Sequence, residues 1–173
     1  MAFSLYDMCV PAFLQTVGAV EGFLAKGAGH FKEKGVDPNS VLDEKLAPDM
    51  LPFAFQIRSV ANHSIGALRG VKAGAFSPGG PAPTLDYAGL QKLVAEAREA
   101  LQQVKPDDVN ACQGKDVLFS VRDIKMTFTA EGFLQTFSMP NFYFHATTAY
   151  DILRHKGVPV GKRDFLGKMR LKS

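Results

Sequence analysis

Residues 141–155 read NFYFHATTAYDILRH, a helical run that carries a histidine on its apolar side shortly after a proline. Four of its residues are spaced four, three and four apart, and they therefore share one face of a helix. They are Asn141, His145, Thr148 and Ile152. A helix that offers metal ligands usually presents a second ligand one turn further on, and here that position is Ala149. The stretch therefore indicates a fold more firmly than a function.

Working outward from this run, the apolar residues predict further long helices. Thr129 can cap the last helix over 130–156, which Pro140 should kink and Gly157 should end. The same helical period predicts three earlier helices, over 5–34 with Ser4 as the cap, over 51–72, and over 86–104.

The connecting segments carry different signals. Alternating apolar residues over 117–121 and 124–128 predict a short β-hairpin. Residues 37–40 predict a turn and 41–45 a short helical piece, while the glycines and prolines of 72–83 predict a loop. Together these elements predict an all-α four-helix bundle, with the hairpin inserted before the last helix, in a single domain spanning 1–173.

Composition favours a soluble cytoplasmic protein. With 173 residues and 46% hydrophobic residues, the chain can bury a core without disulfides or metals. Cys9 and Cys112 lie far apart without CxxC spacing, which indicates reduced thiols. We expect no membrane segment, because Asp7, Glu21 and Lys26 interrupt the apolar N-terminal run.

The net charge of +3 is unevenly distributed, because the last eighteen residues contain six basic side chains against only Asp164. The basic residues are Lys156, Lys162, Arg163, Lys168, Arg170 and Lys172. A nucleic-acid or anionic-surface role is one interpretation. We favour a solvated basic end and expect no nucleic-acid partner, since no aromatic platform or recognition motif accompanies these charges.

The four histidines divide into two pairs. His30 and His155 fall in the last turns of helices, where an imidazolium favours the negative helix end. His63 and His145 fall mid-helix near the packed face, where a neutral imidazole needs hydrogen-bond partners. Gln56 lies seven residues before His63 and should face the same seam, so a cluster with His145 and Asn141 is expected. Such a cluster is either a satisfied polar layer, which we favour, or a site.

Two imidazoles alone make a weak metal site. Open zinc sites normally use three protein ligands, so a carboxylate would have to complete this one. Asp7 and Asp151 are the candidates, although a solvated face is favoured for both. Nucleophilic catalysis is less well supported still. Cys9 is flanked by Met8 and Val10 and is interpreted as core, and no phosphate-binding glycine loop or nucleophile elbow is found.

Three segments carry a family resemblance: LAPDM at 46–50, NFYFHATTAYDILR at 141–154 and GKRDFLG at 161–167. They resemble an uncharacterised bacterial domain-of-unknown-function family grouped with the DinB/YfiT-like proteins, over essentially the whole chain. The resemblance implies an up-down-down-up helical bundle that is often dimeric. It also implies a divalent metal held by three histidines, in a superfamily that includes thiol-dependent S-transferases and isomerases.

Carried over residue by residue, His63 matches the family's second-helix ligand and His145 matches the first of two histidines on the last helix. The third ligand is replaced by Ala149. Our favoured hypothesis is a small-ligand pocket or vestigial metal site without an established activity or a certain cofactor, in a homodimer. Its residues are Gln56, His63, Asn141, His145 and Thr148. The alternative is a transferase or hydrolase that uses a thiol and a divalent metal, zinc or nickel, on His63 and His145.

Overall fold

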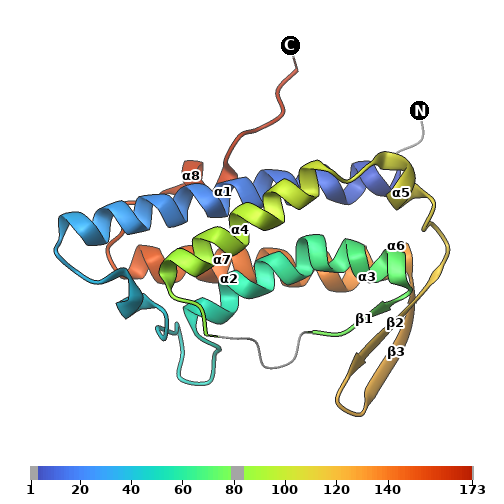
Figure 1. The fold of residues 1–173 in the computed structure, drawn as a ribbon, viewed down its shortest axis with the longest axis horizontal. Coiled ribbons are helices and arrows are strands. Elements are labelled where there is room, and N and C mark those ends of the chain that lie inside the picture. Colours follow the sequence, from blue (N-terminus) through green and yellow to red (C-terminus); the bar gives the residue numbers. More distant parts are fainter. Residues whose placement is uncertain (1–3, 79–83, 173) are drawn as a thin grey trace.

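The computed structural model describes residues 4–78 and 84–172, and it is mostly helical with a small three-stranded sheet at one end (Figure 1). The long helices lie side by side. Helix α1 (Leu5–Glu33) and helix α7 (Met139–His155) run in one direction. Helices α2 (Phe53–Ala61), α3 (Ala67–Ala73) and α4 (Tyr87–Gln102) run in the opposite direction.

Helix α1 begins and ends where the sequence predicts. Ser4 accepts a hydrogen bond from the backbone N–H of Asp7, and the Asp7 carboxylate accepts one from the backbone N–H of Ser4. This capping box satisfies two backbone donors at the start of the helix. Gly35 follows the helix with a φ of 65°, a left-handed conformation that glycine adopts without steric cost.

The second and last helices each contain a π-helical segment. Residues Asn62–Gly66 form one between α2 and α3. Residues Phe133–Ser138 form the other, between α6 (Ala130–Gly132) and α7, directly before Pro140. The predicted helices over 51–72 and 130–156 are therefore confirmed as helical segments. The sequence does not predict the two π-helical segments, in which each turn holds one more residue than in an α-helix. Such segments are often found at functional sites.

The sheet has the order β1-β2-β3. Strands β2 (Asp116–Val121) and β3 (Ile124–Thr129) form the predicted antiparallel hairpin. Strand β1 (Ala75–Phe76) pairs parallel to β2. The expectation of a loop over 72–83 is therefore wrong at 75–76, and also at 72–73, which end α3. Its residues 79–83 lie outside the described residues.

Short helices complete the chain. A 3₁₀ turn, Pro38–Val41, occupies the predicted turn, and α5 (Pro106–Asn110) follows α4. Helix α8 (Lys162–Leu166) lies in the basic end of the chain and packs on α1. Lys26 forms an ion pair with Asp164 at 2.9 Å, and the Gln15 side chain donates to the backbone oxygen of Leu166. The expectation of a wholly solvated basic end is therefore wrong for this helix.

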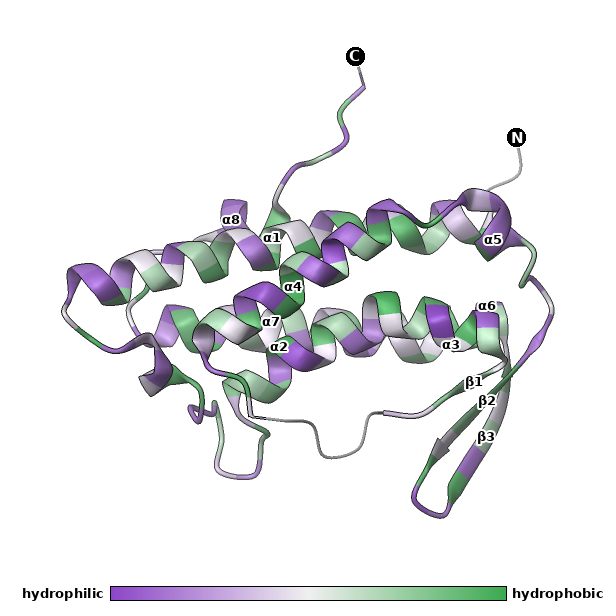
Figure 2. Ribbon diagram, in the orientation of Figure 1, coloured by the Kyte–Doolittle hydropathy of each residue, from purple (hydrophilic) through white to green (hydrophobic). Residues whose placement is uncertain are grey.

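The core lies between the long helices, whose surfaces carry both apolar and polar residues (Figure 2). Its largest fully buried side chains include five phenylalanines, Phe13, Phe23, Phe53, Phe133 and Phe142. By length and composition alone α1 could cross a membrane, a test that core helices of soluble proteins and signal sequences also pass, so the expectation of no membrane segment stays a prediction. Half of the most apolar window of α1 is buried inside the fold.

Candidate functional site

Gln56 fixes the orientation of His145. The Gln56 side-chain nitrogen Nε2 donates to the backbone oxygen of Leu51 at 2.7 Å, and a carbonyl can only accept. The Gln56 oxygen Oε1 therefore faces His145 and lies 2.7 Å from its Nδ1. Because Oε1 is an acceptor, Nδ1 carries the proton. In a neutral imidazole this leaves Nε2 as the free acceptor.

His63 lies beside His145 but lacks such a partner. The two rings are stacked, with centroids 5.7 Å apart and planes inclined by 18°. Within the described residues, the Nδ1 atom of His63 is buried without a hydrogen bond. Buried polar atoms are rarely left in this state, so the satisfied polar layer expected from the sequence is incomplete. The residue that lacks a hydrogen bond, His63, lies inside the first π-helical segment.

Both imidazoles are neutral at pH 7. Burial lowers the pKa of His145 to about 4, because a charged ring would lose its hydration. Burial also lowers the pKa of His63 to about 4, and the neighbouring His145 adds to this effect. The pair therefore presents two uncharged rings, which suit hydrogen bonding or stacking better than pairing with an acid.

A cavity of about 790 Å³ opens beside the two histidines. It is lined from α2, α3, α4 and α7 and from both π-helical segments, the second of which contributes Phe137. Phe55 forms a second aromatic wall, and its ring lies 5.7 Å from that of His145. The cavity therefore combines aromatic surface with two imidazoles, which is typical of small-molecule sites.

The five predicted pocket residues take different positions. His63, His145 and Asn141 line the cavity, and the Asn141 amide donates to the backbone oxygen of Phe137 at 2.7 Å. Gln56 supports His145 and is not itself among the lining residues. Thr148 is also not among them, because its buried hydroxyl donates to the Phe144 oxygen one turn earlier.

Several lining residues were not predicted from the sequence. They include Phe55, Arg58, Asn62, Arg69, Glu96 and Phe137. The two arginines are eleven residues apart, about three turns of a regular α-helix, and both line the cavity although the first π-helical segment lies between them. That spacing could have been read from the sequence, but the wall that the arginines face could not.

A family profile described as "Domain of unknown function (DUF1993)" matches residues 5–166. The chain belongs to the DUF1993 family. The crystal structure of a DinB family member protein from Shewanella denitrificans is similar to it, with a TM-score of 0.78 and 26% sequence identity. The match covers 98% of this chain and 95% of that one, which confirms the DinB-like resemblance. A comparison with curated proteins finds no match.

The donors of this DUF1993 chain do not fit the three-histidine metal site that DinB-like folds imply. Ala149, at the third ligand position, is fully buried in the core. Neither carboxylate candidate lies in the cavity: Asp7 belongs to the capping box of α1, and Asp151 is exposed. Across 4–78 and 84–172, no group of three or more His, Cys, Asp or Glu side chains could hold a metal ion.

The remaining titratable candidates have structural positions in the DUF1993 chain. Cys9 is fully buried, and burial raises the pKa of its thiol to about 12, so the thiol is not a nucleophile at neutral pH. Cys112 is also buried and free. His30 and His155 lie in the last turns of α1 and α7, as predicted.

Proposed function

We propose that the cavity binds a small organic molecule, which donates a hydrogen bond from an O–H or N–H group to the imidazole of His145. The observation that carries this proposal is the Gln56–His145 hydrogen bond. It leaves a neutral ring with Nε2 as its free acceptor on the wall of a 790 Å³ cavity. A ligand that fills the cavity also covers His63, whose Nδ1 atom forms no hydrogen bond with the described residues.

The apolar walls indicate what the body of the ligand resembles. Phe55 and Phe137 offer aromatic faces, and Leu85 and Leu93 add aliphatic surface from the side of α4. A planar or branched apolar body can pack on these groups while a single polar group meets the imidazole. This division of apolar body and few polar anchors favours an organic molecule over an inorganic ion.

The low basicity of the histidines supports binding rather than acid–base catalysis. A general base works best when its pKa lies near the operating pH, whereas His63 and His145 both have pKa values of about 4. Cys9 cannot supply a nucleophile, because burial keeps its thiol protonated. Among the described residues, no group of three or more His, Cys, Asp or Glu side chains supports the alternative of a metal-dependent transferase or hydrolase.

We infer an up-down-down-up four-helix bundle, supported by the directions of α1, α2–α3, α4 and α7 in Figure 1. We infer a reducing cytoplasmic location, supported by two buried free thiols. We infer a homodimer, supported by exposed apolar side chains on α2 and α7, including Phe55 and Phe144.

Ligand-observed NMR tests the binding proposal. The probes are a set of phenols and primary amides, each mixed with wild-type protein, with His145→Phe and with His155→Phe. His145→Phe keeps a ring but removes the acceptor, while His155→Phe makes the same exchange at an exposed position on the same helix. We expect saturation-transfer signals with wild type and His155→Phe that are lost with His145→Phe. Equal signals in all three proteins, or none with wild type, would overturn the proposal.

A further inference from the structure

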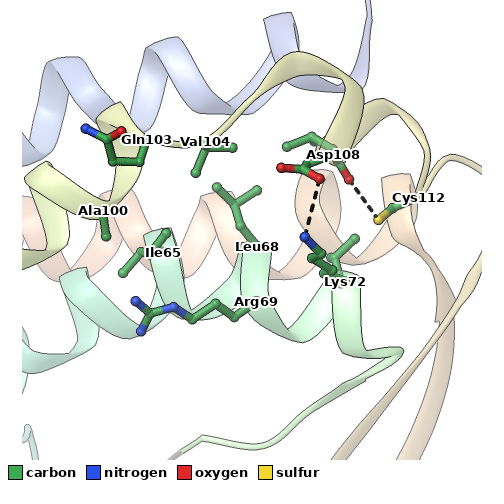
Figure 3. Close-up of a pocket in the computed structure, with 11 residues that line it drawn as sticks. Ile65, Leu68, Arg69, Lys72, Ala100, Gln103, Val104, Asp108 and Cys112 are labelled. Atoms are coloured by element: carbon green, nitrogen blue, oxygen red, sulfur yellow. Dashed lines mark hydrogen bonds and ion pairs between the residues drawn. The ribbon is translucent and has the colours of Figure 1, made fainter.

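A second cavity of about 290 Å³ lies between α3, α4 and α5 (Figure 3). Its walls are mainly apolar, with Leu68 and Val71 on one side and Val104 and Val109 on the other. Ile65 and Arg69 line both this cavity and the larger one. The two cavities therefore lie next to each other and share these two residues.

The polar groups of the second cavity lie at its two ends. Lys72 and Asp108 form an ion pair at 3.3 Å, and the Cys112 thiol donates to the backbone oxygen of Asp108. Figure 3 shows this group at one end and the guanidinium of Arg69 toward the other. The lysine is thus already paired, whereas Arg69 forms no ion pair within the described residues.

The wall of the larger cavity carries excess positive charge. Arg58 and Arg69 both line the larger cavity, and neither has a carboxylate within 4.0 Å among residues 4–78 and 84–172. The acidic side chain on this wall, Glu96, is mostly exposed and lies 3.8 Å from the Lys92 nitrogen. No Asp or Glu occurs at the positions outside the described ranges. Two guanidinium groups beside apolar walls favour an anion with an apolar chain.

We propose that the ligand is an amphipathic carboxylate, whose acid group binds Arg69 and whose apolar chain fills the second cavity. This inference rests on the proposed function, because a separate O–H or N–H group of the same ligand would donate to His145. The guanidinium fork matches a carboxylate through two parallel N–H···O hydrogen bonds. The apolar walls from Leu68 to Val109 then exclude water from the chain.

Octanoate is the probe, because it has the acid and the chain but no hydrogen-bond donor for His145. Isothermal titration of the full-length protein compares octanoate with methyl octanoate, which lacks the charge and also any donor for His145, and with acetate, which lacks the chain. We expect octanoate to bind at least tenfold more tightly than either. Equal binding of octanoate and methyl octanoate, or no binding of octanoate, would overturn the inference.

Two variants and one control variant locate the site. Arg69→Gln should weaken octanoate binding about tenfold, whereas Arg170→Gln removes the same charge at an exposed position outside both cavities and should not. Ala100→Leu adds volume to the wall of the second cavity and should also weaken binding. Full octanoate affinity in Arg69→Gln would contradict the inference.

The two proposals fail separately. Octanoate does not use His145, so its binding should survive His145→Phe. If wild-type protein binds octanoate but gives no phenol or amide signals, the proposed function is refuted and the anion site remains. If wild-type protein gives the phenol and amide signals but does not bind octanoate, the amphipathic carboxylate is refuted and a site for a neutral ligand remains.

Discussion

The buried side chain of Gln56 forms two hydrogen bonds, one through each end of its amide. Its amide nitrogen donates to the Leu51 oxygen, and its amide oxygen accepts from His145 Nδ1, each at 2.7 Å. The Gln56 amide itself lies away from bulk water, since Gln56 is only 1% exposed. The amide therefore determines which nitrogen of His145 is left as an acceptor.

Replacing this amide should affect both stability and the tautomer. Gln56→Leu leaves the Leu51 oxygen and His145 Nδ1 without a partner, which should cost about 1–3 kcal/mol in the free energy of unfolding. Gln102→Leu changes an exposed glutamine on α4 and should stay within about 0.5 kcal/mol of wild type. Urea denaturation measures both variants, and ¹⁵N NMR of the ring nitrogens should show a mixture of tautomers only in Gln56→Leu. An unchanged single tautomer would contradict this role.

The histidine pair makes stability depend on pH. The pKa of each ring is about 4 in the folded protein and 6.5 in an ordinary environment. Between these values the unfolded chain takes up protons and the folded chain does not, so unfolding becomes easier as pH falls from about 7 to 4. From pH 7.5 to 5 we expect each histidine to contribute a loss of about 2 kcal/mol.

Urea denaturation at the two pH values checks this dependence. His145→Phe should lose less stability on acidification than wild type, because one of the two rings is gone. His155→Phe should behave as wild type, since that histidine is exposed. The same loss in wild type and His145→Phe would show that His145 takes up its proton in the folded state as readily as in the unfolded state.

At the scale of elements, the two π-helical segments place side chains in the cavity. Asn62, His63 and Ile65 come from the first segment and Phe137 from the second. The extra residue of a π turn rotates the following helix, so the side chains after it face a different neighbour. Local sequence gives no clear signal for this, because a single π turn is too short to stand out from the α-helical periodicity on either side of it.

Strand β1 depends on a missing side chain in α3. A Cβ atom on Gly70 would lie 3.0 Å from the Ala75 oxygen and 3.0 Å from the Phe76 side chain. The Phe76 ring in turn lies 5.6 Å from the ring of His63. Close approach of the strand to the helix therefore also packs an aromatic ring against the site.

Gly70→Ala should separate the strand from the helix and lower the free energy of unfolding by about 1–3 kcal/mol. Gly22→Ala is the matched control, because Gly22 is an exposed position in α1 with no atom within 4 Å of the added Cβ. It should raise stability by about 0.5–1 kcal/mol, since alanine favours the helix. Thermal and urea denaturation compare the two, and a neutral Gly70→Ala would contradict the close packing.

At the scale of the whole molecule, the sequence predicts what depends on local periodicity. The long helices and the β2–β3 hairpin follow from spacings of about 3.6 and two residues. Strand β1 and helix α8 were missed because each is short and depends on packing against a distant segment, β2 and α1 respectively. His63 and His145 could be chosen from helical position alone. The arginine-lined wall could not, because it exists only where α2 and α3 face α4.

We propose that the two buried imidazoles belong to an organic-ligand cavity and not to a metal centre. Elemental analysis tests this in untagged protein expressed with added zinc, nickel and manganese, alongside His63→Phe and His145→Phe. We predict metal far below one ion per chain, at the same level in all three proteins. Close to one ion per chain in wild type, lost in both variants, would contradict the claim.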